Sequence, residues 1–119
     1  MQLTPKQLDL INKKKVVVLA TADKRSKPRA ILVEVNKAEA DKLIITDNEM
    51  KITKKNILEN NQVFVLAFAE DYSYCLKIEG EAEYHTKGKW FDFVSGLEEN
   101  KKYHPKGAIV ITVKSIKEA

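Results

Sequence analysis

Length, composition and charge limit what this chain can be. With 119 residues, 44% hydrophobic and 32% charged, it has the size and balance of one folded domain, residues 1–119, rather than of a disordered chain. A formal charge of +4, from 21 Lys and Arg against 17 Asp and Glu, is too small for a dedicated nucleic-acid binder. One cysteine and two histidines exclude an intrachain disulfide and indicate no metal site, and no apolar run reaches the roughly 20 residues of a membrane-spanning helix. We therefore expect a protein of the reducing cytoplasm.

Three short helices are predicted. The first begins after Thr4 and runs to about residue 14, because Pro5 suits the first helical position and Gln7 completes a capping box. A second is expected over residues 51–60. Apolar and aromatic side chains recur at helical spacing over residues 87–98 and predict a third, amphipathic helix.

Strands account for most of the remaining chain. Two apolar runs, residues 16–22 and 63–69, have no polar face, which is typical of strands buried on both sides. Residues 74–85 alternate apolar and charged side chains, which predicts one buried and one solvent-facing side. The predicted strands are residues 16–22, 29–35, 42–47, 63–69, 74–85 and 108–113.

This order of elements predicts a mainly β fold. Six strands joined mostly by short polar turns, with one helix between the third and the fourth, favour a six-stranded antiparallel barrel over a parallel βαβ sheet. A small barrel leaves one face of every strand pointing outward, so it cannot bury both faces of residues 16–22 and 63–69. A second copy of the chain would cover the outward faces, and we therefore expect a homodimer.

The second helix carries cations at its unfavourable end. Lys51, Lys54 and Lys55 lie in its first turns, although a helix N-terminus already presents unpaired N–H groups and a partial positive charge. A bound phosphate would be stabilised by the N–H groups, the helix dipole and the ammonium groups together, and Thr53 adds a hydroxyl donor. The alternative is a solvated lysine-rich helix, which charge placement alone favours.

The strand end before this helix has two interpretations as well. Thr46, Asp47 and Asn48 lie where the polar edge of a ligand could meet side-chain and backbone groups. Asp and Asn are also common turn formers at such positions, without any ligand.

In combination, these motifs resemble the FMN-binding split-barrel family that includes pyridoxamine 5'-phosphate oxidases, and its small flavin-binding branch in particular. The likeness covers residues 16–113. It rests on the "KP" turn at residues 27–28, on LIITDNEMKITKKNILENNQVFVLAF from residue 43 and on YCLKIEGEAEYH from residue 74.

The resemblance implies FMN in a groove between two subunits of a split β-barrel, with its phosphate at the start of the short helix. It assigns the phosphate to Lys51, Thr53 and Lys54, with Met50 beside them, and the polar edge of the flavin to Thr46, Asp47 and Asn48. It assigns the ring to Leu32, Val33 and Glu34, and a contact from the other subunit to His104, with Tyr103 beside it. Many relatives have an "SRK"-like triplet where this chain has Ile52-Thr53-Lys54, so an arginine is absent from the helix start.

Two functions from different classes remain open. One is a homodimeric FMN-binding protein that acts as a small flavin-dependent oxidoreductase or electron carrier, with the redox chemistry residing in the cofactor. The other is a non-catalytic binding module for another phosphorylated or tetrapyrrole ligand. True pyridoxamine 5'-phosphate oxidases are longer and use a C-terminal extension to grip the substrate phosphate, so oxidation of vitamin B6 is not expected. Single-stranded nucleic acid is not expected either, because the tyrosines are scattered instead of interleaved with basic residues.

Overall fold

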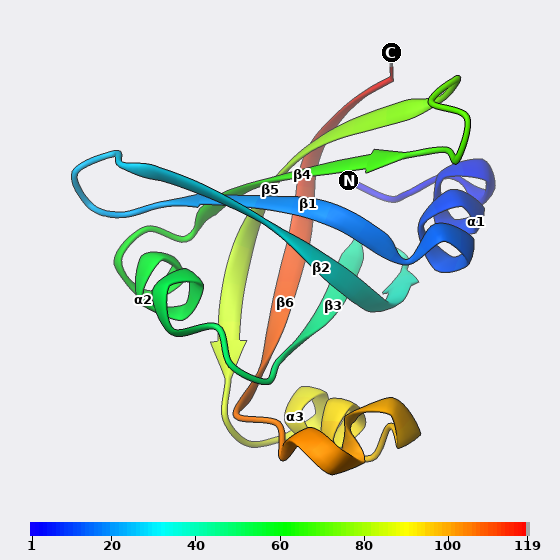
Figure 1. Ribbon diagram of the computed structural model, residues 1–119. Coiled ribbons are helices and arrows are strands. Elements are labelled where there is room, and N and C mark those ends of the chain that lie inside the picture. The colour runs from blue at the N-terminus through cyan, green and yellow to red at the C-terminus, as the bar shows by residue number, and fades with distance from the viewer. Residues whose placement is uncertain (119) are drawn as a thin grey trace.

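Six strands close into one antiparallel barrel in the order β1-β2-β3-β6-β5-β4 (Figure 1). The computed structural model describes residues 1–118. Its elements are α1 (Pro5–Lys14), β1 (Val16–Ala22), β2 (Pro28–Glu39), β3 (Lys42–Asp47), α2 (Lys51–Glu59), β4 (Gln62–Phe68), β5 (Cys75–His85), α3 (Lys89–Ser95), the 3₁₀ helix η1 (Glu98–Tyr103) and β6 (Gly107–Glu118). The prediction of a mainly β, six-stranded antiparallel barrel is confirmed.

Two strands are longer than the sequence pattern indicated. β2, expected over residues 29–35, continues to Glu39 because a bulge between Val35 and Lys37 shifts the alternation by one residue. Ala38 is therefore buried again beyond the bulge. β6, expected over residues 108–113, continues to Glu118 past a similar irregularity in its pairing with β5. A bulge interrupts the alternation of buried and exposed residues, but the strand continues beyond the bulge.

The predicted helix over residues 87–98 is wrong in its extent. α3 ends at Ser95, Gly96 occupies its C-cap, and a separate 3₁₀ helix follows as η1. Glycine favours such an end because its backbone loses more conformational freedom in a helix than that of residues with a side chain. The break matters for the site, because it lets Asn100 of η1 turn inward, where it is 4% exposed. No helix within residues 1–118 combines the length and the apolar character needed to cross a membrane.

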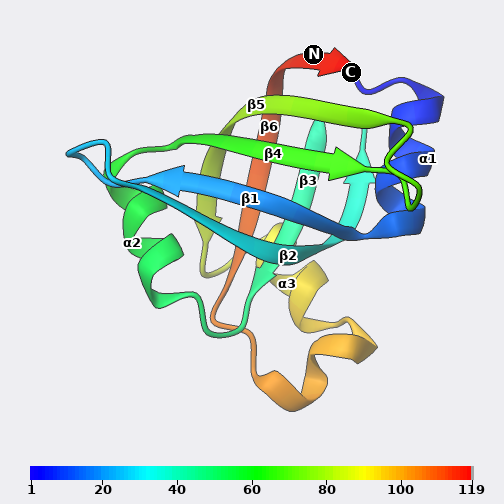
Figure 2. The same ribbon diagram turned by 45° about the horizontal axis from the view of Figure 1, so that its top comes forward.

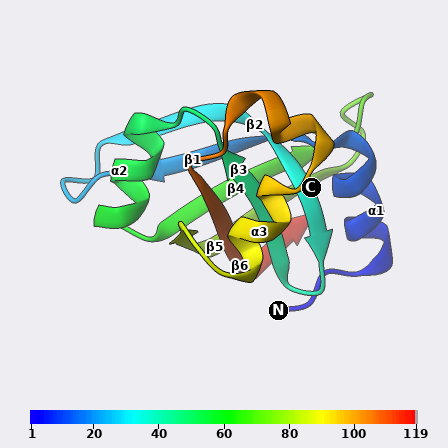
Figure 3. The same ribbon diagram turned by 90° about the horizontal axis from the view of Figure 1, so that it is seen from below.

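The barrel interior is one apolar core, and the helices pack against the barrel. Leu19, Val65 and Ile78 are fully buried in it, Ile11 of α1 and Ile57 of α2 pack against it, and α1 and α2 lie on opposite sides of the barrel (Figures 1 and 2). The predicted capping box of α1 is present. α3 covers the outer face of β3 and β6 through a smaller cluster, and Figure 3 shows it from below.

An apolar surface covers the outside of β1, β2 and β4. We call it the apolar face. Val18 pairs with Leu32 on one side and Leu66 on the other, and Ala20 pairs with Ala30 and Phe64. Leu32 is 70% exposed and Phe64 is 37% exposed. Within one chain β1 and β4 are therefore buried on one side, and their outward sides form the surface for which a second copy of the chain was predicted.

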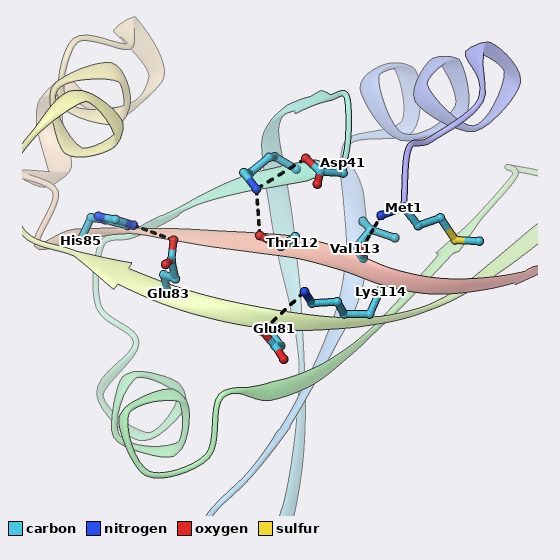
Figure 4. A network of polar contacts seen from close by, with 9 residues as sticks. Met1, Asp41, Glu81, Glu83, His85, Thr112, Val113 and Lys114 are labelled. Carbon is cyan, nitrogen blue, oxygen red and sulfur yellow. Dashed lines mark hydrogen bonds and ion pairs between the residues drawn. The ribbon is translucent and has the colours of Figure 1, made fainter.

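The opposite outer surface, over β5 and β6, is polar (Figure 4). Lys114 lies 3.7 Å from Glu81, His85 lies 3.2 Å from Glu83, and Lys42 donates to the Thr112 hydroxyl at 2.9 Å. These side chains alternate with the buried residues of the same strands, as the sequence predicted for β5. β5 and the part of β6 that α3 leaves uncovered thus have one dry and one charged side, whereas the apolar face lies over β1, β2 and β4.

Candidate functional site

Two hollows of opposite charge flank the first turns of α2. The acidic hollow, about 280 Å³, lies over the outer side of β2 and the end of β3, with Leu32, Glu34, Asn48, Met50, Glu99 and Tyr103 among its lining residues. The basic cleft, about 260 Å³, lies between the β1–β2 turn and α2 and is lined by Asp23, Lys27, Pro28, Arg29, Ile52, Lys55 and Asn56. The start of α2 separates the two: its N-cap residue Met50 lines the acidic hollow, whereas Ile52 and Lys55 line the basic cleft.

The acidic hollow brings together many of the residues that were predicted to bind the flavin cofactor. They come from β2, from the end of β3 and from the start of α2, and they are Leu32, Val33, Glu34, Thr46, Asn48 and Met50. Asn36, Glu99 and Asn100 join them without having been predicted, and Tyr103, predicted beside His104 as a contact from the other subunit, lines the hollow of its own chain. Glu99, Asn100 and Tyr103 lie on η1, which begins at Glu98, where the predicted helix over residues 87–98 ends.

A chain of side-chain hydrogen bonds runs along the floor of the acidic hollow. Asn48 Nδ2 donates to Asn100 Oδ1 at 3.5 Å, and Asn100 Nδ2 donates to Thr46 Oγ1 at 2.8 Å. The Thr46 hydroxyl donates to Asn36 Oδ1 at 2.7 Å, and Asn36 Nδ2 donates to Glu99 at 3.4 Å. Each side chain therefore donates to the next one in the row, and acceptor atoms remain at the two ends, on Asn48 and on Glu99.

One of these acceptors is buried without a partner. Asn100 Nδ2 also donates to the Val94 carbonyl at 2.8 Å, so its Oδ1 must face Asn48 and fixes the orientation of the Asn48 amide. This leaves Asn48 Oδ1 buried with no hydrogen-bond partner. Buried acceptors are normally satisfied, so this atom is suited to an N–H group of a ligand.

The charge of this hollow is the reverse of the charge of the chain. Its charged lining residues among those that the structure describes are Glu34, Glu49 and Glu99, although the whole chain carries +4. Glu49 lies 3.2 Å from Lys106 and 3.7 Å from Lys51, and the hydrogen bond from Lys106 is the main cause that lowers its pKa. The hollow therefore suits an uncharged or cationic group better than an anion.

Asp47 supports α2 and does not line the hollow. Its side chain is 1% exposed, and its Oδ1 accepts the N–H of Met50 at 2.6 Å. Its Oδ2 accepts a hydrogen bond from the Tyr84 hydroxyl. His104 also lies outside this hollow of its own chain, in a left-handed conformation that ends η1, whereas its neighbour Tyr103 lines it.

The three residues predicted at the phosphate point in different directions. The side chain of Lys51 is 85% exposed and lies near Glu49, and Thr53 is buried with 2% exposure. The Lys54 ammonium instead lies 4.9 Å from the centre of the Tyr84 ring. A helix turns about 100° per residue, so positions 51 and 53 cannot share a face.

The basic cleft adds cations that the sequence interpretation did not assign. Lys27 and Arg29 come from the β1–β2 turn and the start of β2, and they face Lys55 of α2. The Asp23 carboxylate in this cleft accepts the backbone N–H groups of Lys27 and Arg25, which lowers its pKa. The "KPR" stretch was visible in the sequence, but its place beside α2 follows only from the closed barrel.

Comparison with known proteins establishes the family. The model of the pyridoxamine 5'-phosphate oxidase family matches residues 3–118. The chain belongs to this family of FMN-binding split barrels. The resemblance inferred from the sequence is thereby confirmed, and the barrel, α2 and the residues of both hollows all lie within the matched range.

Several relatives of this split barrel share its sequence or its fold. An uncharacterized protein of Methanocaldococcus jannaschii, MJ0282, is 36% identical over 107 residues, which cover 85% of this chain and 70% of that protein. HupZ of Group A Streptococcus is 23% identical with a TM-score of 0.86, covering 96% and 91% of the two chains.

Two more split barrels have names that mention a cofactor. An FMN-binding protein of Syntrophomonas wolfei is 16% identical with a TM-score of 0.78, covering 94% of this chain and 82% of its own. A structure named F420 reductase is 16% identical with a TM-score of 0.74, covering 97% and 98%. At such low identity these structures show a common fold.

The residues of this split barrel fit both parts of FMN. An oxidised flavin ring is uncharged and has one ring N–H, which matches a hollow with an unpartnered buried acceptor at Asn48 and apolar walls at Leu32 and Met50. A phosphate is an anion and matches the cations Arg29 and Lys55 of the neighbouring cleft.

Proposed function

We propose that this split barrel is a homodimeric FMN-binding protein, a small flavin-dependent oxidoreductase or electron carrier, with FMN at the dimer interface. The observation that carries the proposal is the pair of hollows of opposite charge on either side of the α2 start. One ligand with a neutral ring and an anionic tail satisfies both. A bound flavin supplies electron or hydride transfer, and the protein contributes position and electrostatics.

The proposed contacts of the ring and of the phosphate lie at different positions along β2. Leu32, Met50 and Asn48 are the proposed contacts of the ring, and Arg29 and Lys55 of the basic cleft are the proposed contacts of the phosphate. Lys54 lines neither hollow, and we propose that it reaches the phosphate from the start of α2. Arg29 thus provides the arginine that the helix start lacks. A strand rises about 3.3 Å per residue, so Arg29 and Leu32 are about 10 Å apart along β2, a separation that one extended ligand can bridge.

A second copy of this chain is the proposed partner of the apolar face. Two copies related by a two-fold axis would bury the same rows of small and apolar side chains against each other. Leu32 belongs to both the apolar face and the acidic hollow, so the second copy would border the flavin ring. His104 or Tyr103 of that copy is then the proposed contact from across the interface.

Titration by quenching of flavin fluorescence tests the phosphate assignment. We expect the protein to bind FMN more tightly than riboflavin, which lacks the phosphate. Lys54→Glu and Arg29→Glu should each weaken FMN roughly tenfold or more and leave riboflavin unchanged, because each removes a charge-assisted contact of about 1.5–3 kcal/mol. Lys114→Glu, on the polar outer surface, is the matched control for a change of charge.

Other outcomes separate the alternatives. Equal affinity for FMN and riboflavin would reject the phosphate site. A visible spectrum of the purified protein with a tetrapyrrole band and no flavin would favour the binding module, and tighter binding of F420 than of FMN would change the cofactor but not the fold. If the protein binds FMN but no electron donor reduces the bound FMN, the assignment of the FMN site would stand and the role as an oxidoreductase would be rejected.

A further inference from the structure

Lys54 differs from the other lysines of α2 in what holds its ammonium group. Lys51 lies 3.7 Å from Glu49, and Lys55 lies 3.7 Å from Glu59. Within residues 1–118, Lys54 has no carboxylate at ion-pair distance, and its Nζ lies 4.9 Å from the centre of the Tyr84 ring. A cation–π contact restrains an ammonium group without neutralising its charge.

The Tyr84 ring is itself fixed on two sides. Its hydroxyl donates to Asp47 Oδ2, and burial together with this hydrogen bond raises the pKa of Tyr84, so the hydroxyl remains a donor at neutral pH. Gly107 lies directly against the ring, and a Cβ atom at that position would overlap the ring atoms. The absence of a side chain at position 107 therefore leaves the space that the Tyr84 ring occupies.

The same carboxylate orders the start of α2. Asp47 Oδ1 accepts the N–H of Met50, the residue that precedes the helix, while Oδ2 holds Tyr84. Asp47 also pairs with Gly107 across β3 and β6. Asp47, Tyr84 and Gly107 are distant in the sequence but in contact in the fold. Together they fix the start of α2 and the Tyr84 ring on which the Lys54 ammonium lies.

We propose that Tyr84 is a positioning residue that holds the Lys54 ammonium at the start of α2 in readiness for the anionic group of the ligand. The inference rests on the proposed phosphate site. Lysine has a flexible four-carbon stem, and an ammonium already restrained before binding loses less freedom when the anion arrives. Side chains point back toward the N-terminus of their helix, which brings Lys54 from the first turn toward the helix start.

The first test compares FMN with riboflavin in variants of Tyr84. Tyr84→Leu removes the ring, and the preference for FMN should fall about two- to fivefold while riboflavin affinity stays the same. Tyr84→Phe keeps the ring and should retain most of the preference. In a Lys54→Met background, Tyr84→Leu should cause no further loss, because the two residues act as a unit.

A matched control is available elsewhere in the chain. Tyr74 also lies beneath a lysine, with Lys6 Nζ 4.2 Å from its ring centre, and its hydroxyl donates to Glu118 at 2.8 Å. Tyr74→Leu removes a comparable set of contacts far from α2 and should leave the preference for FMN unchanged. If Tyr84→Leu does not fold, Tyr84→Met, which retains volume without a ring, takes its place.

The second test needs no flavin. In NMR spectra of the ligand-free protein, the ε-methylene protons of Lys54, assigned by their loss in Lys54→Met, should be shifted upfield by the Tyr84 ring. The shift should persist in Tyr84→Phe and disappear in Tyr84→Leu. An unshifted signal in the parent protein would overturn the contact.

The outcomes distinguish this inference from the proposed function. Equal affinity of the parent protein for FMN and riboflavin would overturn the phosphate site and the role of Tyr84 with it. A parental preference for FMN that Tyr84→Leu retains would overturn the role of Tyr84 alone. A fall in the affinities for FMN and riboflavin by the same factor would show that Tyr84 is merely structural.

Discussion

At the residue scale, the carboxylates of the acidic hollow distinguish this site from a generally basic one. Glu34 and Glu99 line the hollow, and among the described residues neither has an ion pair with a lysine, an arginine or a histidine. Adding an electron to a flavin adds negative charge unless a proton follows. Carboxylates near the ring therefore oppose reduction, by an amount that solvent screening keeps small.

This argument predicts the reduction potential of bound FMN. Glu34→Gln and Glu99→Gln should each raise it by an amount on the order of 10 mV, and the double variant should raise it further. Spectroelectrochemical titration at constant ionic strength measures the change. Glu98→Gln is the control, since Glu98 is paired with Lys101 and does not line the hollow. A lower potential in either variant would contradict the placement of the ring.

At the element scale, the first turn of α2 depends on a carboxylate that precedes it. Asp47→Ala leaves the partly buried N–H of Met50 and the Tyr84 hydroxyl without their acceptor. We expect the free energy of unfolding to fall by about 2–3 kcal/mol, measured by urea denaturation followed by circular dichroism. Asp41→Ala, at a partly exposed turn beside Lys42, should cost less than about 1 kcal/mol. Equal costs for the two would show that Asp47 is no more than a turn former.

The elements themselves could be predicted from local pattern, and the site only partly. Alternation over β5 and the capping box of α1 depend on neighbours in the sequence, so both were predicted correctly. The extent of β2 was not, because the bulge at Val35 breaks the period that reveals a strand. Arg29 and Asn100 reach the site through pairing of distant segments, and no short-range signal connects them with α2.

At the scale of the whole molecule, the two halves of the barrel surface have opposite character. The outer side of β5 and β6 carries Glu81, Lys114 and His85, whereas the apolar face presents aliphatic and aromatic side chains over β1, β2 and β4. Contiguous exposed apolar surface on this scale is typical of interaction sites. The charged half provides a surface that remains in water when the other half is covered.

The dimer can be separated from the fold by two lysine substitutions. Val18 lies at the centre of the apolar face between Leu32 and Leu66, while Val65, 0% exposed, lies in the barrel core. Val18→Lys should leave a folded monomer in sedimentation equilibrium at micromolar concentration, because a charge at the centre of a two-fold interface meets its own copy. Its affinity for FMN should fall as well, since the second copy borders the acidic hollow through Leu32. Val65→Lys should instead lower the melting temperature or prevent folding, because it places an unpaired charge in an apolar core. A parent protein that is monomeric at these concentrations, or a Val18→Lys variant that stays dimeric, would overturn the assignment of the apolar face to a second copy.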